Sequence, residues 1–192
     1  MIMIRQFTAL LILFLVGTGF LQLIHAGEIF SRGSKWNYYK GNDHPSGGDL
    51  EWTEVDFDES DWLNGKSPFR YGDGSGGTLL SDMPNKYTTV FFRKFFTVAN
   101  PKDISELDFI IDYDSLATVG HESGTFETFA LQDPGSFLVK GKNVISIMGL
   151  NVGMNSSDFL MNSELQSFQS DKSNPKVVSI DPPSGEVGSL LE

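Results

Sequence analysis

The stretch YTTVFFRKFFTV, residues 87–98, decides the fold class. It is rich in β-branched and aromatic residues, and apolar side chains fall at odd and even positions alike, interrupted by Arg93 and Lys94. Successive side chains of a β-strand point to opposite faces. The pattern therefore predicts a strand covered on both sides, as in the inner strands of a β-sandwich. The run VISIMGL, residues 144–150, is also apolar on both faces, and we expect a second inner strand there.

Further strand signals flank these two runs. Residues 107–113 alternate apolar and acidic side chains, apart from Ile110, which predicts one buried and one solvent-facing side. Short apolar segments at 35–39, 126–131 and 159–168 are additional candidates, and clusters of Gly, Pro, Asn and Asp separate them. We therefore predict an all-β fold, an antiparallel β-sandwich or jelly roll.

The two ends of the chain differ from this middle part. Arg5, an apolar run and the small Ala26 give residues 1–26 the layout of a secretory signal peptide. An uncleaved membrane anchor is the alternative, but the apolar run is shorter than the roughly 20 residues that a span prefers. We expect an exported protein, secreted, periplasmic or at the cell surface, that leaves the membrane after cleavage. The sandwich would occupy 27–169, and 170–192 would be a linker into a truncated following domain or, alternatively, a frayed tail.

Composition excludes several classes of function. The chain has 25 acidic and 14 basic residues, a formal net charge of −11 and no cysteine. A nucleic-acid partner is not expected at this charge, and disulfides, thiolate metal sites and a cysteine nucleophile are excluded. Gly72, Gly74 and Gly77 fit G-x-G-x-x-G, but no strand–helix unit surrounds them, which favours a glycine-rich loop. No histidine cluster or serine-nucleophile motif is present, so we expect no enzyme activity and assign no catalytic residue.

An acidic cluster is the candidate metal site. Asp56, Asp58 and Asp61 lie close together in VDFDESDW, and carboxylates are calcium ligands. An EF-hand loop is excluded, because Asp61 occupies the position that requires glycine. The alternative is a solvated turn whose side chains accept hydrogen bonds from nearby backbone amides. A structural calcium is therefore the candidate cofactor at these three residues.

Aromatic residues are the candidate ligand contacts. Trp36, Tyr38, Trp52 and Tyr71 would stack on sugar faces if they are exposed, and would pack in the core if they are not. In the segment 35–39, Trp36 and Tyr38 face one way and Tyr39 the other.

The ordered succession of several strings resembles a known family. These are WxxYxG at 36–41, DFDESDW at 56–62, PFRYGDGSGGT at 68–78, TTVFFRKFFTV, LDFIIDYD, GHESGTFETFAL, GKNVISIMGLN and SSDFLMNSEL. Together they resemble galactose-binding-like β-sandwich modules, the accessory jelly-roll domains of large secreted bacterial proteins. The resemblance implies a non-catalytic module that binds carbohydrate or a cell-surface glycoconjugate, in some relatives with a structural calcium. A structural spacer or adhesion domain is the alternative, and a hydrolase fragment is a third.

The chain departs from this family after Asp114. Such modules continue there with a strand and a hairpin, whereas Asp114-Ser115 runs directly into Leu116-Ala117. Relative to this family about two strands are missing, either because an inner hairpin has been lost or because the reading frame is defective or misjoined. We expect their loss to leave neighbouring strand edges exposed.

Overall fold

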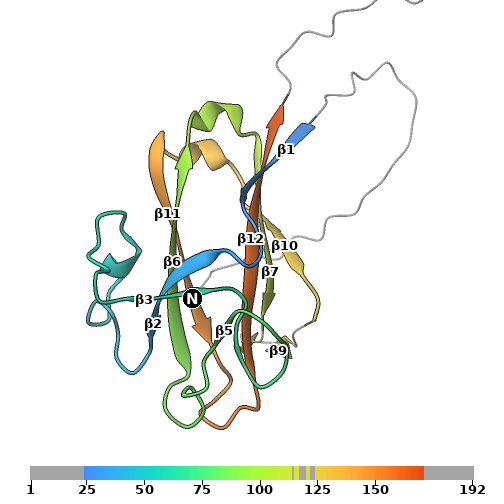
Figure 1. The fold of residues 1–192 in the computed structure, drawn as a ribbon. Helices are drawn as coiled ribbons and strands as arrows, with labels where there is room; N and C mark the ends of the chain where they lie inside the picture. Colours follow the sequence, from blue (N-terminus) through green and yellow to red (C-terminus); the bar gives the residue numbers. More distant parts are fainter. Residues whose placement is uncertain (1–23, 114, 117–119, 122–123, 171–192) are drawn as a thin grey trace, which may run out of the picture.

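The computed structural model describes residues 24–113, 115–116, 120–121 and 124–170. Within these residues the protein is all β, with two packed sheets and three short 3₁₀ turns, η1 (Glu51–Thr53), η2 (Pro101–Asp103) and η3 (Pro134–Ser136). The predicted β-sandwich is confirmed. Figure 1 shows the sheets side by side, β6 and β11 in one and β7, β10 and β12 in the other.

Among the described residues, the larger sheet has six strands. Five lie in the order β10-β7-β12-β4-β5, and β1 pairs with the far end of β12. These strands are β1 (Ile24–Phe30), β4 (Phe69–Tyr71), β5 (Thr78–Leu79), β7 (Glu106–Tyr113), β10 (Glu127–Ala130) and β12 (Phe159–Ser170). The smaller sheet, in the part of the chain that the structure describes, has four strands in the order β11-β6-β2-β3. They are β2 (Lys35–Lys40), β3 (Leu63–Lys66), β6 (Thr89–Val98) and β11 (Gly141–Leu150). A separate antiparallel pair is formed by β8 (Ser115–Leu116) and β9 (Gly120–His121).

Large apolar side chains fill the space between the sheets. Phe69 of β4 and Phe92 of β6 are fully buried, with ring centroids 4.9 Å apart, and Tyr38 of β2 lies 5.1 Å from Phe69. Leu107, Phe109 and Ile111 of β7 contribute every second side chain, as the alternation predicts. Burying such residues supplies most of the favourable free energy of folding.

The expected strand segments coincide with the longer strands of the structure. The segments 35–39, 107–113, 126–131 and 159–168 fall on β2, β7, β10 and β12. Most of the segment 87–98 forms β6, an inner strand between β11 and β2, as predicted. Asp112 of β7 differs from the expectation of a solvent-facing side chain, because the backbone N–H of Gly124 donates to its Oδ1 and the residue is buried.

The prediction of an inner strand at 144–150 is wrong. These residues belong to β11, which lies at the edge of the smaller sheet. Its inner face packs in the core through Ile147. Its outer face is partly covered by the segment around η1, which contacts β11. A strand therefore reads as apolar on both faces when a loop covers one of them, whether or not it lies inside the sheet.

The chain ends are only partly described. β1 begins at Ile24, and its residues 24–26 pair with Phe168, Gln169 and Ser170 of β12, so the end of the expected signal peptide overlaps this strand. Residues 1–23, residues 171–192 and Asp114 lie outside the described residues. Within the described part, no helix has the length and apolar character needed to cross a membrane.

The glycine-rich segment is a loop, as predicted. It joins β4 to β5 and does not open a helix. Gly77 has φ +63°, and a Cβ at this position would meet the Pro68 carbonyl oxygen at 1.9 Å. Only glycine tolerates both conditions, so this residue allows β5 to return alongside β4.

Candidate functional site

The four aromatic residues proposed from the sequence as ligand contacts are all buried. Trp36 is 1% exposed, and Tyr38, Trp52 and Tyr71 are 8%, 4% and 4% exposed. Trp36, Tyr38 and Tyr71 belong to the central core, and Trp36 and Tyr38 face opposite to Tyr39, as predicted. A ring without an exposed face cannot stack on a sugar, so the expectation of an aromatic platform at these residues is not met.

The three acidic residues proposed as a calcium site do not form one cluster. Asp56, Asp58 and Asp61 are all exposed, and no group of three potential ligands comes together within the described residues. Asp58 Oδ1 accepts a hydrogen bond from the backbone N–H of Ser60 at 3.0 Å. This bond and the Ser60 side chain hold the pKa of Asp58 below its usual range. The arrangement at Asp58 is that of the solvated turn, the alternative considered from the sequence.

The segment that contains these acids covers the outer face of the smaller sheet. We call residues 41–62, between β2 and β3, the covering loop; it projects to the left in Figure 1. Its Trp52 packs edge-to-face on Phe91 of β6, with ring centroids 5.1 Å apart. Trp62 stacks on Trp52 at 6.4 Å and lies 5.6 Å from Tyr39 of β2. The covering loop thus builds a second aromatic cluster outside the sandwich.

A buried arginine ties the covering loop to the sheet. Arg93 of β6 is 0% exposed, and its Nε donates to Glu59 Oε2 at 2.5 Å. Its two terminal nitrogens donate to the backbone carbonyls of Trp52 and Glu54. Glu59 Oε1 accepts from Asn37 Nδ2 at 2.5 Å. Every charged group in this network therefore has a partner, as burial of an ion pair requires.

An open groove lies beside this network. It has a volume of about 580 Å³ and is bordered by residues 55–60 of the covering loop, Asn37 of β2, Phe95 of β6 and Lys142 of β11. Asp56 and Asp58 line it together with Phe57. The volume falls within the range of roughly 300–1,000 Å³ typical of small-molecule sites. The groove is the candidate functional site.

The groove is lined by both apolar and polar groups. Phe57 and Phe95 are half-buried, and Lys142 Nζ lies 3.6 Å from the centroid of the Phe95 ring, which is a cation–π contact. Asn64 Nδ2 donates to Asn37 Oδ1 at 2.7 Å. The amide of Asn37 is thereby held in a fixed orientation but retains one free N–H and one lone pair. The groove thus presents ring surface, carboxylates, an amide and an ammonium group.

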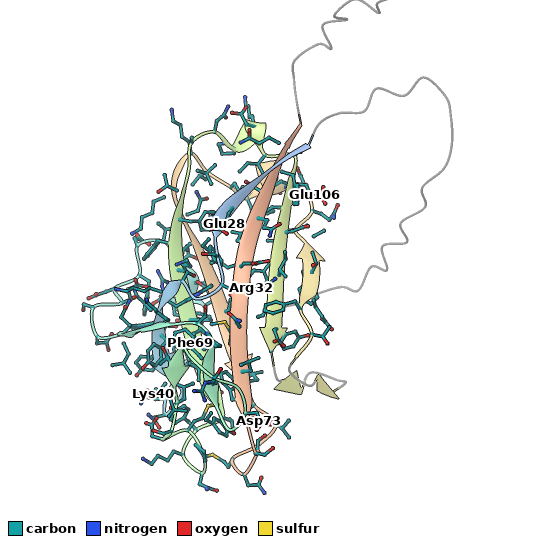
Figure 2. The ribbon with its side chains drawn as sticks, turned by 45° about the vertical axis from the view of Figure 1, so that its right-hand side comes forward. Glu28, Arg32, Lys40, Phe69, Asp73 and Glu106 are labelled. Atoms are coloured by element: carbon teal, nitrogen blue, oxygen red, sulfur yellow. The ribbon has the colours of Figure 1, made fainter. Side chains whose placement is uncertain are left out.

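The outer face of the larger sheet is polar and has a different character. Arg32 lies across β12, where its Nη2 forms an ion pair with Glu164 Oε1 at 2.9 Å (Figure 2). Burial, with a smaller contribution from Glu106, raises the pKa of Asp108 on β7. A raised carboxyl pKa is one requirement of a glycosidase acid. Asp108 and Glu106, however, lie on one strand of an outer sheet face, and neither borders the groove.

The sequence pointed to two residues of the groove but not to those that the strands and Glu59 contribute. Asp56 and Asp58 were singled out, but as metal ligands, whereas Phe95, Lys142, Asn37 and Glu59 were not. A signal did exist: Arg93 interrupts an otherwise apolar strand and therefore needs a buried counter-charge. The acidic segment 56–61 is a nearby source of that charge.

Comparisons with known proteins add no argument about the fold or the function of this chain. No family model matches the sequence, and no curated protein matches it. Among solved structures the chain is similar to a beta-glucuronidase from an uncultured Clostridium species, with 14% identity and a TM-score of 0.46. The alignment covers 82% of this chain but 31% of that chain, so this chain spans less than a third of the enzyme. A likeness at this level carries no argument about function.

Proposed function

We propose that this protein is a non-catalytic, exported β-sandwich module that binds carbohydrate in the groove between the covering loop and the smaller sheet. The observation that carries this proposal is the combination of ring surface and hydrogen-bonding groups in one open groove. A sugar offers an apolar C–H face and a rim of hydroxyl groups. Phe57 would contact the C–H face, and Asp56, Asp58 and Asn37 would accept from or donate to the hydroxyls.

The charge of the groove selects among glycans. Asp56 and Asp58 provide two carboxylates that have no cationic partner among the described ion pairs, and the whole chain has a formal charge of −11. Like charges repel, so uronate-rich polymers would bind weakly. Neutral polysaccharides are therefore the expected ligand class.

Two observations support a binding role without chemistry. Glu59, the most enclosed carboxylate of the groove, uses one oxygen for Arg93 and the other for Asn37. It is therefore a positioning residue that holds the covering loop. Asp108, the acid with a raised pKa, does not border the groove.

The test is a calorimetric titration of the purified protein with each of three polymers: soluble glucan, soluble xylan and polygalacturonate. We expect binding to a neutral polymer, and Phe57→Ala and Asp58→Asn should each weaken it about tenfold, as loss of a central contact does. Matched controls are Phe137→Ala and Asp73→Asn, which make the same changes at exposed positions outside the groove. Both controls should bind like the wild type.

A structural spacer is the second candidate, and the burial of Trp36, Tyr38, Trp52 and Tyr71 favours it. A spacer would bind none of the three polymers, and Phe57→Ala would alter only thermal stability. That result would replace the binding proposal with the spacer.

A further inference from the structure

β11 presents a long edge without a strand partner. Its 10 residues pair with β6 in a continuous antiparallel register from Gly141↔Val98 to Leu150↔Thr89. On its other side, no strand among the described residues pairs with it. Half of the hydrogen-bonding groups of its backbone therefore lack a sheet partner in a single copy.

The register identifies which backbone groups these are. The N–H of Asn151 donates to the carbonyl oxygen of Thr88 at 2.7 Å, which extends the β11–β6 ladder by one rung. In an antiparallel ladder, residues alternate between directing both backbone groups toward the partner and directing both away. Because Asn151 points toward β6, the even-numbered residues direct their N–H and C=O groups away from the sheet. These are Lys142, Val144, Ser146, Met148 and Leu150.

The sequence and register of β11 carry little protection against pairing. Proteins blunt exposed edges with proline, bulges or several charged residues. β11 has no proline, one charged residue (Lys142) and no irregularity in its register. It also carries apolar side chains at its margin, with Met148 half-buried and Leu150 37% exposed. Such an edge is suited to the addition of another strand.

We propose that β11 pairs antiparallel with β11 of a second copy of this chain, which joins the two smaller sheets into one. The strand is self-complementary when the pairing is centred on Ser146, whose backbone points outward. Every position then meets a compatible residue, and no two like charges face each other. The opposed pairs are Lys142 with Leu150, Val144 with Met148, Ser146 with Ser146, Ile145 with Ile147 and Asn143 with Gly149.

A closed two-fold pair also explains why the edge can remain unprotected. An isologous interface uses the same surface of both subunits, so pairing removes both edges and cannot continue into a fibre. The formal charge of −11 on each copy opposes association. Salt screens this repulsion, so the dimer should strengthen as the ionic strength rises.

The test is sedimentation equilibrium of the purified full chain and of two variants at Leu150. In the proposed register, Leu150→Glu places a carboxylate opposite Lys142 of the second copy, and Leu150→Lys places an ammonium group there. With two such pairs in each dimer, the dissociation constants of the two variants should differ by about 2- to 30-fold, with the Glu variant tighter. General electrostatic repulsion between the two copies predicts the reverse order. The formal charge of each copy becomes −12 in the Glu variant (−11 − 1) and −10 in the Lys variant (−11 + 1).

The control is the same pair of changes at Leu79, an exposed residue of β5 in the larger sheet. Leu79→Lys should dimerise at least as well as Leu79→Glu.

Amide hydrogen exchange provides a second readout, because the outward N–H groups of Val144, Ser146 and Met148 should gain protection as concentration rises. A monomer at every concentration and salt level would overturn the proposal. So would a dimer insensitive to Leu150, or protection of these amides that does not depend on concentration, which would indicate that the chain's own residues cover the edge.

Discussion

The two faces of β6 are buried in two different ways. The inner face buries Val90, Phe92 and Val98 in an apolar core. The outer face buries Phe91 and Arg93 under the covering loop, where charged and backbone groups bond to each other. Apolar packing is non-directional and requires only matching volume. The ionic network, by contrast, requires particular partners at particular distances.

This difference suggests separate roles for the two layers. The core holds the two sheets together, so damage there should affect the whole molecule. The Arg93–Glu59 network fixes only the covering loop and hence the groove. We expect changes on the outer face to alter the loop before they unfold the sandwich.

The largest effect is expected from Phe92→Ala. Phe92 is fully buried and contacts Phe69 across the sandwich, so its truncation leaves a cavity. The free energy of unfolding should fall by about 3–5 kcal/mol. Denaturant unfolding followed by circular dichroism and by tryptophan fluorescence should show one shared transition. A loss below about 1 kcal/mol would mean that this site is not tightly packed.

Arg93→Met should have the next largest effect. It leaves the Glu59 carboxylate and the carbonyls of Trp52 and Glu54 without their donor. The free energy of unfolding should fall by about 3 kcal/mol, the lower end of the range for breaking a buried ion pair. The lower end applies because Glu59 keeps some contact with water. Tryptophan fluorescence should change at a lower denaturant concentration than circular dichroism, since Trp52 and Trp62 report on the covering loop.

The neighbouring Lys94→Met is the matched control for Arg93→Met. Lys94 faces the inner side, where its Nζ donates to the Lys35 carbonyl oxygen and burial lowers its pKa. Its charged form is already disfavoured, so removing the charge should change stability by less than about 1 kcal/mol. Equal losses of unfolding free energy for Arg93→Met and Lys94→Met would show that Arg93 has no special role in holding the covering loop.

Glu59→Gln should destabilise the protein less than Arg93→Met. The amide keeps the shape and one acceptor but loses the charge that pairs with Arg93. We expect the free energy of unfolding to fall by about 1.5–2 kcal/mol, the lower part of the range for a hydrogen bond to a charged group. In a double-mutant cycle, Glu59→Gln should cost less in the Arg93→Met background. Additive costs would show that the two side chains do not interact.

The smallest effect concerns Tyr39, at the margin of the covering loop. Its hydroxyl donates to Asp43 Oδ1 at 2.5 Å, and this bond, with smaller contributions from burial and from the charges of Asp43 and Asp61, raises the pKa of Tyr39 from 10.0 to about 12. A pKa raised by folding means that the stability gained is complete below pH 10 and is lost as the pH rises through about 12. The difference in unfolding free energy between the wild type and Tyr39→Phe should therefore shrink over this interval. A constant difference, with no late-titrating tyrosinate absorbance in the wild type, would show that the bond is absent.

The fold was largely predictable because its signals are local. Residues 87–98 and 107–113 carry strand patterns that identify β6 and β7 without reference to the rest of the chain. Short strands such as β4 and β5 were missed, because two or three residues give too little periodicity. The position of β11 at an edge was not predictable from its own residues, since sheet order depends on which strands lie beside it.

The candidate site was less predictable, for a related reason. Asp56 and Asp58 were recognisable as polar residues of a turn, but Phe95 and Lys142 come from two distant strands. For Trp36 and Trp52 the sequence left ligand contact open as an alternative to core packing, which is the commoner role of a large aromatic residue. Only the packing shows that both are buried. Sequence pattern reports which side chains are apolar, and not which neighbours cover them.

The sequence by itself therefore determined the all-β class, the main strands, the glycine-rich loop and the acidic character of the chain, because propensity, alternation and charge are properties of nearby residues. Only the tertiary structure decided that Arg93 is buried against Glu59, that the covering loop forms a groove with β6 and β11, and that β11 ends the sheet. These features depend on contacts between residues far apart in the chain, such as the 34 positions that separate Glu59 from Arg93. Such contacts form only when the packing of the whole domain brings the partners together.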